Sequence, residues 1–264
     1  MDKILLLDKK VGETPLECLE GFRASKIAEG HAEFAGLPMT YAGRLDPMAS
    51  GALLILLGEE CKKKEKYLGL DKEYEVEILF GVETDTQDVL GLITKVADDS
   101  AKMISRAISN IDLQKYVGKF AQKYPAYSSK TVGGKQLHTH AREGTLPDAD
   151  EMPSLEVEIY SIKKNGEKNG CRTMTGAEIA RKAIEAILKV RGDFRQNEIL
   201  DGWNNFSKKY GTRKFTMTKI RVLCSSGTYM RSLAEKIGKH IKIGADAGVG
   251  ALAFSIHRTK IAGF

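Results

Sequence analysis

Hydrophobic residues recur along this chain with spacings typical of strands and of helices. Residues 73–80 alternate between apolar and acidic side chains, which predicts a half-buried strand, and residues 155–159 repeat this pattern. The uninterrupted apolar run 52–57 lies between two glycines and predicts a fully buried strand. A shorter apolar run, 4–7, predicts another strand near the N-terminus.

Three segments carry the signals of helices. Residues 14–17 (Thr-Pro-Leu-Glu) form a capping box with proline at the first helical position, and they predict a helix through about residue 28. Residues 100–111 have helical spacing, and residues 175–178 form a second capping box ahead of an apolar stripe. Strands separated by helices without a strict βαβ repeat predict a mixed α/β or α+β fold.

Two segments do not follow either period. Residues 123–151 are rich in Lys, Tyr, Gly and His, which indicates a long functional loop, with an ordinary solvated loop as the alternative. Residues 165–213 are charged and helix-prone and lie between two strand-like segments. We therefore expect them to form an insertion on the surface of the sheet.

Composition narrows the class of protein. The formal net charge of +6 over 264 residues favours a polyanionic partner. The four cysteines are far apart, so we expect neither a disulfide framework nor a zinc site, and the five histidines show no metal-binding spacing. No apolar run has the length of a signal peptide core or a membrane span. We therefore predict a cytoplasmic protein with no membrane association and no metal.

One carboxylate stands out by its position. Residues 43–51 (Gly-Arg-Leu-Asp-Pro-Met-Ala-Ser-Gly) place Asp46 in a tight turn directly before the buried run 52–57. Such a turn can hold a carboxylate rigid and partly desolvated, which suits a nucleophile. Asp followed by Pro is also a common turn former, so local chemistry leaves a nucleophile and a simple turn residue equally open.

The longer string 41–53 (Tyr-Ala-Gly-Arg-Leu-Asp-Pro-Met-Ala-Ser-Gly-Ala-Leu) closely resembles the catalytic motif of the TruB family of tRNA pseudouridine synthases. The resemblance implies that Asp46 is the catalytic nucleophile and acts on a flipped-out uridine. It implies attack at the sugar C1′, attack at the uracil ring, or assistance of a glycal-forming elimination, and leaves these routes open. The reaction needs no cofactor and no metal.

Two further strings point to partners for Asp46. Tyr74 alone would be read as a core residue of its strand, but its place matches the family's active-site tyrosine, which stacks on the target base. Residues 224–233 (Cys-Ser-Ser-Gly-Thr-Tyr-Met-Arg-Ser-Leu) resemble the second family motif, whose arginine, here Arg231, pairs with the catalytic Asp. An arginine there is able to hold Asp46 in its ionised form, although it could equally pair with a surface carboxylate. We expect Thr228 to cap the helix that carries Arg231.

The resemblance also implies an RNA-binding surface. Residues 123–151 resemble the family's RNA-gripping thumb, in which basic residues and tyrosines would contact phosphates and bases. Tyr41 replaces the histidine that the family usually wedges into the tRNA elbow, Lys10 replaces a proline of the N-terminal motif, and His138 replaces a thumb tyrosine. The expected substrate-binding residues are Lys9, Tyr41, Arg44, Tyr127, Lys130, Lys135, Arg142 and Tyr229.

Taken as a family member, the chain is expected to be one catalytic domain, 1–264, of α+β class with a pseudouridine synthase fold. That fold is a mixed, largely antiparallel sheet flanked by helices. The sequence stops just past the closing strand at Phe264, so we expect the family's C-terminal RNA-binding (PUA-like) domain to be missing. Binding of tRNA would then depend on the catalytic domain. Lys189, Arg191 and Arg195 either help this binding or lie on a helix that is only solvated.

The function expected from the resemblance is isomerisation of uridine 55 in the T arm of tRNA to pseudouridine, by a monomer whose partner is tRNA. Two alternatives remain at this stage. One is a pseudouridine synthase for another RNA. The other is an RNA chaperone that folds the tRNA elbow without catalysis.

Overall fold

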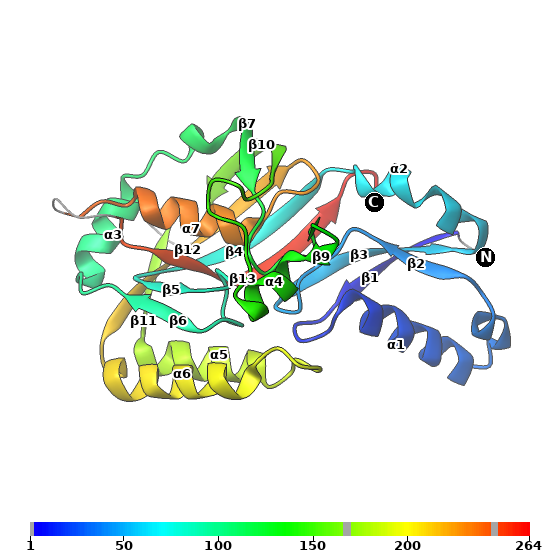
Figure 1. The fold of residues 1–264 in the computed structure, drawn as a ribbon, viewed down its shortest axis with the longest axis horizontal. Helices are drawn as coiled ribbons and strands as arrows, with labels where there is room; N and C mark the ends of the chain where they lie inside the picture. Colours follow the sequence, from blue (N-terminus) through cyan, green and yellow to red (C-terminus); the bar gives the residue numbers. More distant parts are fainter. Residues whose placement is uncertain (1–2, 166–169, 244–247) are drawn as a thin grey trace.

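The computed structural model describes residues 3–165, 170–243 and 248–264. Within them, one large sheet runs the length of the molecule (Figure 1). All its strand pairs are antiparallel except β3 with β13, so the expected mixed, largely antiparallel sheet is confirmed. Its strands, in spatial order, are β1 (Ile4–Lys9), β3 (Ala49–Leu57), β13 (Ala251–Ile261), β4 (Lys72–Phe80), β12 (Lys214–Cys224), β10 (Ser154–Lys164) and β7 (Gly118–Lys123).

Shorter strands complete the sheet at two places and form two small hairpins. Strand β2 (Met39–Ala42) pairs with β3, and β11 (Cys171–Thr175) pairs with β12. Strands β5 (Val82–Thr84) and β6 (Ile93–Val96) form one separate hairpin, and β8 (Thr131–Val132) and β9 (Lys135–Gln136) form the other.

Helices cover both faces of the central sheet. On one face α3 (Ala101–Ser109) and α7 (Met230–His240) pack against the alternating residues of β4, β10 and β12. On the other face lies the hairpin of α5 (Gly176–Ile187) and α6 (Gln196–Tyr210), seen below the sheet in Figure 1. Trp203 of α6 is fully buried and its indole N–H donates to Val89 O at 3.0 Å, which ties the hairpin to the main domain.

The strand β3 is buried on both faces, as its apolar run predicts. Helix α1 (Pro15–Ala28) covers one face and α2 (Lys64–Leu68) the other, and short 3₁₀ turns lie at Ala32–Ala35, Gly58–Lys63 and Gln114–Tyr116. Gly51 lets β3 approach β13, because a Cβ at its φ of +102° would lie 2.3 Å from Arg258 O. The start of β3, three residues after Asp46, is thereby fixed against the centre of the sheet.

The expected strands and helices are confirmed, including both capping boxes, but two segments differ from expectation. The thumb, residues 123–151, is not a continuous loop: it holds β8, β9 and α4 (Leu137–Glu143), which ends at Gly144 in the left-handed conformation. The segment 165–213 is only partly a surface insertion. Residues 166–169 lie outside the described residues, and β11 extends the sheet itself before the helical hairpin begins.

In the part of the chain that the structure describes, no helix combines the length and the apolar character needed to cross a membrane.

Candidate active site

Asp46 lies in the loop between β2 and β3, and 38% of its side chain is exposed. The backbone of this loop is hydrogen-bonded to the turn that follows β1. The N–H of Gly12 donates to Pro47 O at 2.8 Å, and the Lys9 ammonium lies 3.5 Å from the same carbonyl. The carboxylate is therefore presented by a loop whose backbone is fixed on the side away from solvent.

Lys9 does not lie where we expected a residue that contacts RNA. Its side chain is fully buried, and its ammonium donates to Lys10 O at 2.9 Å and to Glu13 O at 2.5 Å. Burial lowers the pKa of Lys9 to about 8. Because its donors are used by backbone carbonyls, Lys9 supports the loop of Asp46 rather than facing a substrate.

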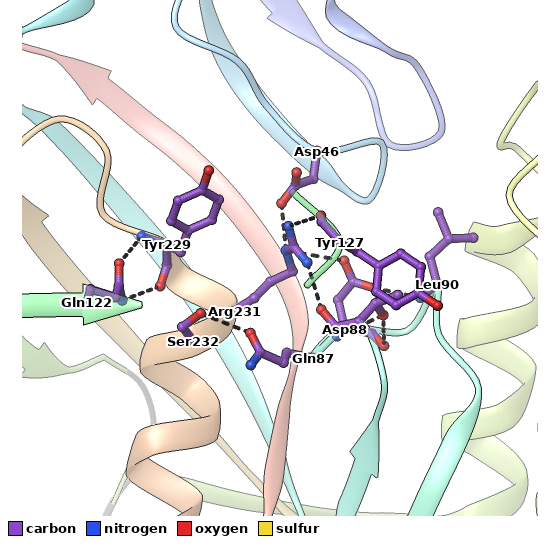
Figure 2. A network of polar contacts seen from close by, with 10 residues as sticks. Asp46, Gln87, Asp88, Leu90, Gln122, Tyr127, Tyr229, Arg231 and Ser232 are labelled. Carbon is purple, nitrogen blue, oxygen red and sulfur yellow. Dashed lines mark hydrogen bonds and ion pairs between the residues drawn. The ribbon is translucent and has the colours of Figure 1, made fainter. Parts of the chain in front are cut away.

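Arg231 is the direct partner of Asp46. It lies in the first turn of α7, only 3% of its side chain is exposed, and its Nε donates to Asp46 Oδ2 at 2.7 Å (Figure 2). Its two other nitrogens donate to Thr86 O at 2.7 Å and to Tyr127 O at 3.2 Å. Burial alone would lower the pKa of the guanidinium, but Asp46 and the nearby Asp88 reverse this and raise it. Arg231 is thus a fixed cation, oriented by three separate segments.

Asp88 completes this charged group and was not anticipated from the sequence. Its Oδ2 lies 3.8 Å from Arg231 Nε, and its Oδ1 accepts from Thr86 Oγ1 at 2.7 Å and from Leu90 N at 2.9 Å. Burial raises the pKa of Asp88 to about 6, against the opposing effect of Arg231. One buried arginine therefore stands between two carboxylates, of which only Asp46 is substantially exposed.

The start of α7 is organised differently from the expected threonine cap. The N-cap residue is Tyr229, and the hydroxyl of Thr228 donates to Ser225 O instead. Gln122 of β7 bonds both backbone groups of Tyr229, at 2.8 Å to the N–H and 3.1 Å to the carbonyl (Figure 2). In addition, Ser232 donates to Gln87 Oε1 at 2.9 Å. The helix therefore begins without a side-chain cap, and the backbone of its N-cap residue is held by Gln122 of β7 instead.

Tyr74 and Arg258 lie beside this group on adjacent strands. They are register partners across β4 and β13, and both line the same cavity as Asp46. Burial raises the pKa of the Tyr74 hydroxyl, while Arg258 acts in the opposite direction. Arg258 is 1% exposed; its Nε donates to Ala52 O at 2.6 Å and its Nη1 to Arg44 O at 3.2 Å. Arg258 therefore connects the loop of Asp46 to β13, the strand that pairs with β4 at Tyr74.

The cavity at Asp46 has a volume of about 590 Å³, which is enough for a nucleotide. The structure brings most of the expected site residues to it. Lys130 and Lys135 are not among its lining residues: the Lys130 ammonium lies 5.3 Å from the centre of the Tyr124 ring, and Lys135 pairs with Glu143. The expected residues that do line it are Tyr41, Arg44, Asp46, Tyr74, Tyr127, Arg142, Tyr229 and Arg231.

Sequence reasoning missed three charged residues that line this cavity, namely Lys72, Asp88 and Arg258. Arg195, which we considered only as an aid to tRNA binding or as part of a solvated helix, lines it as well. A polar run at the end of a buried strand, 84–88 (Thr-Asp-Thr-Gln-Asp), was the available signal for Asp88. Across the described ranges, no group of three or more His, Cys, Asp or Glu side chains is placed to hold a metal ion. The site thus consists of one accessible carboxylate, a buried cation and an aromatic wall, which suits nucleophilic attack on a bound planar group.

Comparison with known proteins shows that the sequence of this chain is similar to those of one family. Residues 37–175, more than half of the chain, match the model of the TruB family pseudouridylate synthases (N-terminal domain). The chain is 30% identical over 244 residues to "tRNA pseudouridine synthase B" of Xanthomonas oryzae pv. oryzae, covering 92% of this chain and 59% of that protein. It is 30% identical over 254 residues to "tRNA pseudouridine synthase 4" of Saccharomyces cerevisiae, covering 83% and 59%. It is 29% identical to "tRNA pseudouridine synthase B" of Bordetella avium over its whole length and 82% of that protein.

The chain thus spans 59% of the length of the Xanthomonas and yeast relatives. Among solved structures, it is similar to a chain in the crystal structure of a Cbf5–Nop10–Gar1 complex. The TM-score is 0.51 at 17% identity, and the match covers 98% of this chain and 48% of the other. This likeness confirms the expected pseudouridine synthase fold.

Proposed function

Because this chain belongs to the TruB family of pseudouridylate synthases, we propose that it converts uridine to pseudouridine in tRNA, at the T-arm position numbered 55. The observation that carries the proposal is the contact of Asp46 with the buried Arg231 at the edge of a nucleotide-sized cavity. Its relatives in Xanthomonas, Bordetella and yeast are named as tRNA pseudouridine synthases, which supports tRNA as the substrate.

The reaction is an isomerisation and can be balanced without a second substrate. The bond between N1 of uracil and C1′ of the ribose breaks, and a bond between C5 and C1′ forms. C5 loses a proton and N1 gains one. For this to occur, the uridine must leave its stack and enter the cavity, where the base can turn over.

Asp46 acts as the nucleophile in this proposal. It attacks C1′ or the uracil ring, or it assists elimination to a glycal with Tyr74 taking the proton. Arg231 fixes the direction of the Asp46 carboxylate, because its buried guanidinium donates a charge-assisted hydrogen bond to Asp46 Oδ2 at 2.7 Å. The ring of Tyr74, on the cavity wall beside Arg258, stacks on the flipped base.

RNA binding would involve the thumb and the loop before Asp46. Tyr41 lines the cavity, and the ammonium of Lys64 lies 5.2 Å from the centre of its ring. This places an aromatic face and a cation next to each other, a combination that suits an RNA loop with unstacked bases and nearby phosphates. Arg44 is exposed at the same cavity and is available for phosphate contacts. Arg142 is also exposed there, but it is paired with Asp193 and would have to exchange this partner for a phosphate.

Release of tritium from unmodified tRNA labelled at uridine C5 tests the function, because C5 loses its hydrogen only when the new bond forms. We expect the wild type to release label and Asp46→Asn to release none while still binding tRNA. Asp201→Asn, an exposed position on α6, is the matched control and should behave as the wild type. Release by Asp46→Asn at the wild-type rate would contradict the nucleophile. No release by the wild type would contradict the activity.

A further inference from the structure

The hairpin of α5 and α6 reaches the catalytic cavity through its tip, residues 188–195. Phe194 and Arg195 of this tip line the cavity. The backbone of Lys189 lies so close to Gly12 that a Cβ on Gly12, at its φ of +96°, would be 2.6 Å from Lys189 O. Since Gly12 also donates to Pro47 O, the tip packs directly behind the loop that carries Asp46.

Arg195 is the residue of the tip with the most specific contacts. Its Nη1 lies 2.8 Å from Asp85 Oδ2, and its guanidinium carbon lies 4.6 Å from the centre of the Tyr127 ring. The Tyr127 hydroxyl donates to the same Asp85 oxygen at 3.1 Å. The Arg195 and Asp85 side chains are 20% and 23% exposed, so this pair is less screened than an ordinary surface ion pair.

The backbone at Arg195 is held in an uncommon conformation. Its φ of 61° lies in the left-handed region, which a residue with a Cβ seldom adopts. The tip is braced by Gln196, whose side chain accepts from Phe194 N at 2.8 Å and donates to Gly192 O at 2.6 Å. Such a conformation persists where the surrounding contacts determine it, and here they aim Arg195 at Tyr127.

Tyr127 in turn connects the tip to the reacting carboxylate. Its carbonyl accepts from Arg231 Nη2 at 3.2 Å, and Arg231 donates to Asp46. A second ion pair connects the thumb to the tip, because Arg142 Nη1 of the thumb lies 3.2 Å from Asp193 Oδ2 of the tip. The tip therefore holds the thumb at the point where the thumb carbonyl orients Arg231.

We propose that Arg195 is a positioning residue, which fixes Tyr127 so that its carbonyl holds Arg231 in line with Asp46. The tip of the α5–α6 hairpin, residues 188–195, then supports the catalytic site, whereas the exposed face of α5 does not. This inference rests on the proposed function, because the quantity that Arg195 controls is the rate of the pseudouridine-forming step.

The test compares Arg195→Ala and Arg195→Lys with a matched control, Arg181→Ala. Arg181 lies on the same hairpin and, among the residues that the structure describes, its one ion-pair partner is the exposed Glu185 at 2.7 Å. Its replacement by alanine removes the same charge. The readout is the single-turnover rate constant for pseudouridine formation with tRNA at saturation. We expect Arg195→Ala to lower it about tenfold, Arg195→Lys to restore most of it, and Arg181→Ala to leave it unchanged.

A merely structural role would lower the melting temperature and leave the saturated rate of the folded protein intact. A rate for Arg195→Ala equal to that of Arg181→Ala would overturn the proposal, and so would an Arg195→Lys as slow as the alanine variant. If Arg195→Ala does not fold, Arg195→Gln keeps a shorter polar side chain without the charge and should show the same loss.

Hydrogen exchange separates this inference from the proposed function. Thumb amides in residues 127–143 should exchange faster in Arg195→Ala than in Arg181→Ala, whether or not the wild type modifies tRNA. Unchanged exchange would contradict the contact itself. An inactive wild type with the expected exchange pattern would contradict only the proposed function.

Discussion

Replacing Asp88 with asparagine removes a titrating carboxylate from the Arg231 group while keeping the size of the side chain. Burial raises the pKa of Asp88 to about 6 from its ordinary value of 3.8, even with Arg231 at 3.8 Å. Between these two pH values the folded protein holds a proton at Asp88 that the unfolded chain has lost. The free energy of unfolding contributed by this group therefore falls as the pH rises.

The size of the effect follows from the shift. A rise of about two pKa units corresponds to about 3 kcal/mol, at about 1.4 kcal/mol for each unit. This stabilising contribution is fully present below about pH 4 and is lost as the pH rises through about 6. An asparagine at this position does not titrate, so it makes no pH-dependent contribution to the free energy of unfolding of Asp88→Asn.

Urea unfolding of the wild type and Asp88→Asn, from about pH 4 to about pH 8, measures the difference directly. The free energy of unfolding of Asp88→Asn should rise by about 3 kcal/mol relative to the wild type across this range. Taking the difference cancels the other titrating groups and any fixed packing difference at the amide. A difference that does not change with pH, or one that changes in the opposite direction, would refute the reasoning.

Three further predictions concern Arg231, Gly12 and Tyr41. In Arg231→Lys the ammonium cannot reproduce the contacts of the planar guanidinium to three segments, so the single-turnover rate constant at saturating tRNA should fall at least about 100-fold. A loss of less than tenfold would contradict this. Gly12→Ala, which clashes with Lys189, should lower the free energy of unfolding in urea by about 2 kcal/mol, whereas Gly21→Ala, in open space on α1, should raise it by about 1 kcal/mol. Tyr41→Ala should raise KM for tRNA about tenfold and Tyr41→Phe should not, because the ring stacks on a base. Equal KM values for Tyr41→Ala and Tyr41→Phe would exclude stacking.

Local features of this protein could be predicted from its sequence because their partners are near in the chain. The capping box at Thr14 and Glu17 starts α1 as expected, and the alternation of residues 73–80 gives β4. The expected cap at Thr228 was wrong because the N-cap is the next residue, Tyr229, and the Thr228 hydroxyl donates to Ser225 O. Gln122, 107 residues away in the chain, bonds the backbone of Tyr229. Strand β11 was missed because it is short and pairs with β12, a contact with no local signal.

The charged group of the site could be predicted only in part. Asp46 and Arg231 are 185 residues apart, so only the resemblance of their two strings to a family placed them together. The polar run 84–88 indicates a polar turn after a strand, but it does not reveal that Asp88 is buried against Arg231. Arg195, in a charged segment typical of solvated helices, is aimed at the cavity only because the hairpin tip packs behind the Asp46 loop.

Mapping of pseudouridine at nucleotide resolution in a tRNA transcript, before and after incubation with the protein, tests the central claim most directly. With the wild type we predict one new pseudouridine, at position 55 of the T arm, and with Asp46→Asn we predict none. A transcript that stays unmodified by folded wild-type protein, or one modified equally by Asp46→Asn, would contradict the account of Asp46 and Arg231 as a catalytic pair.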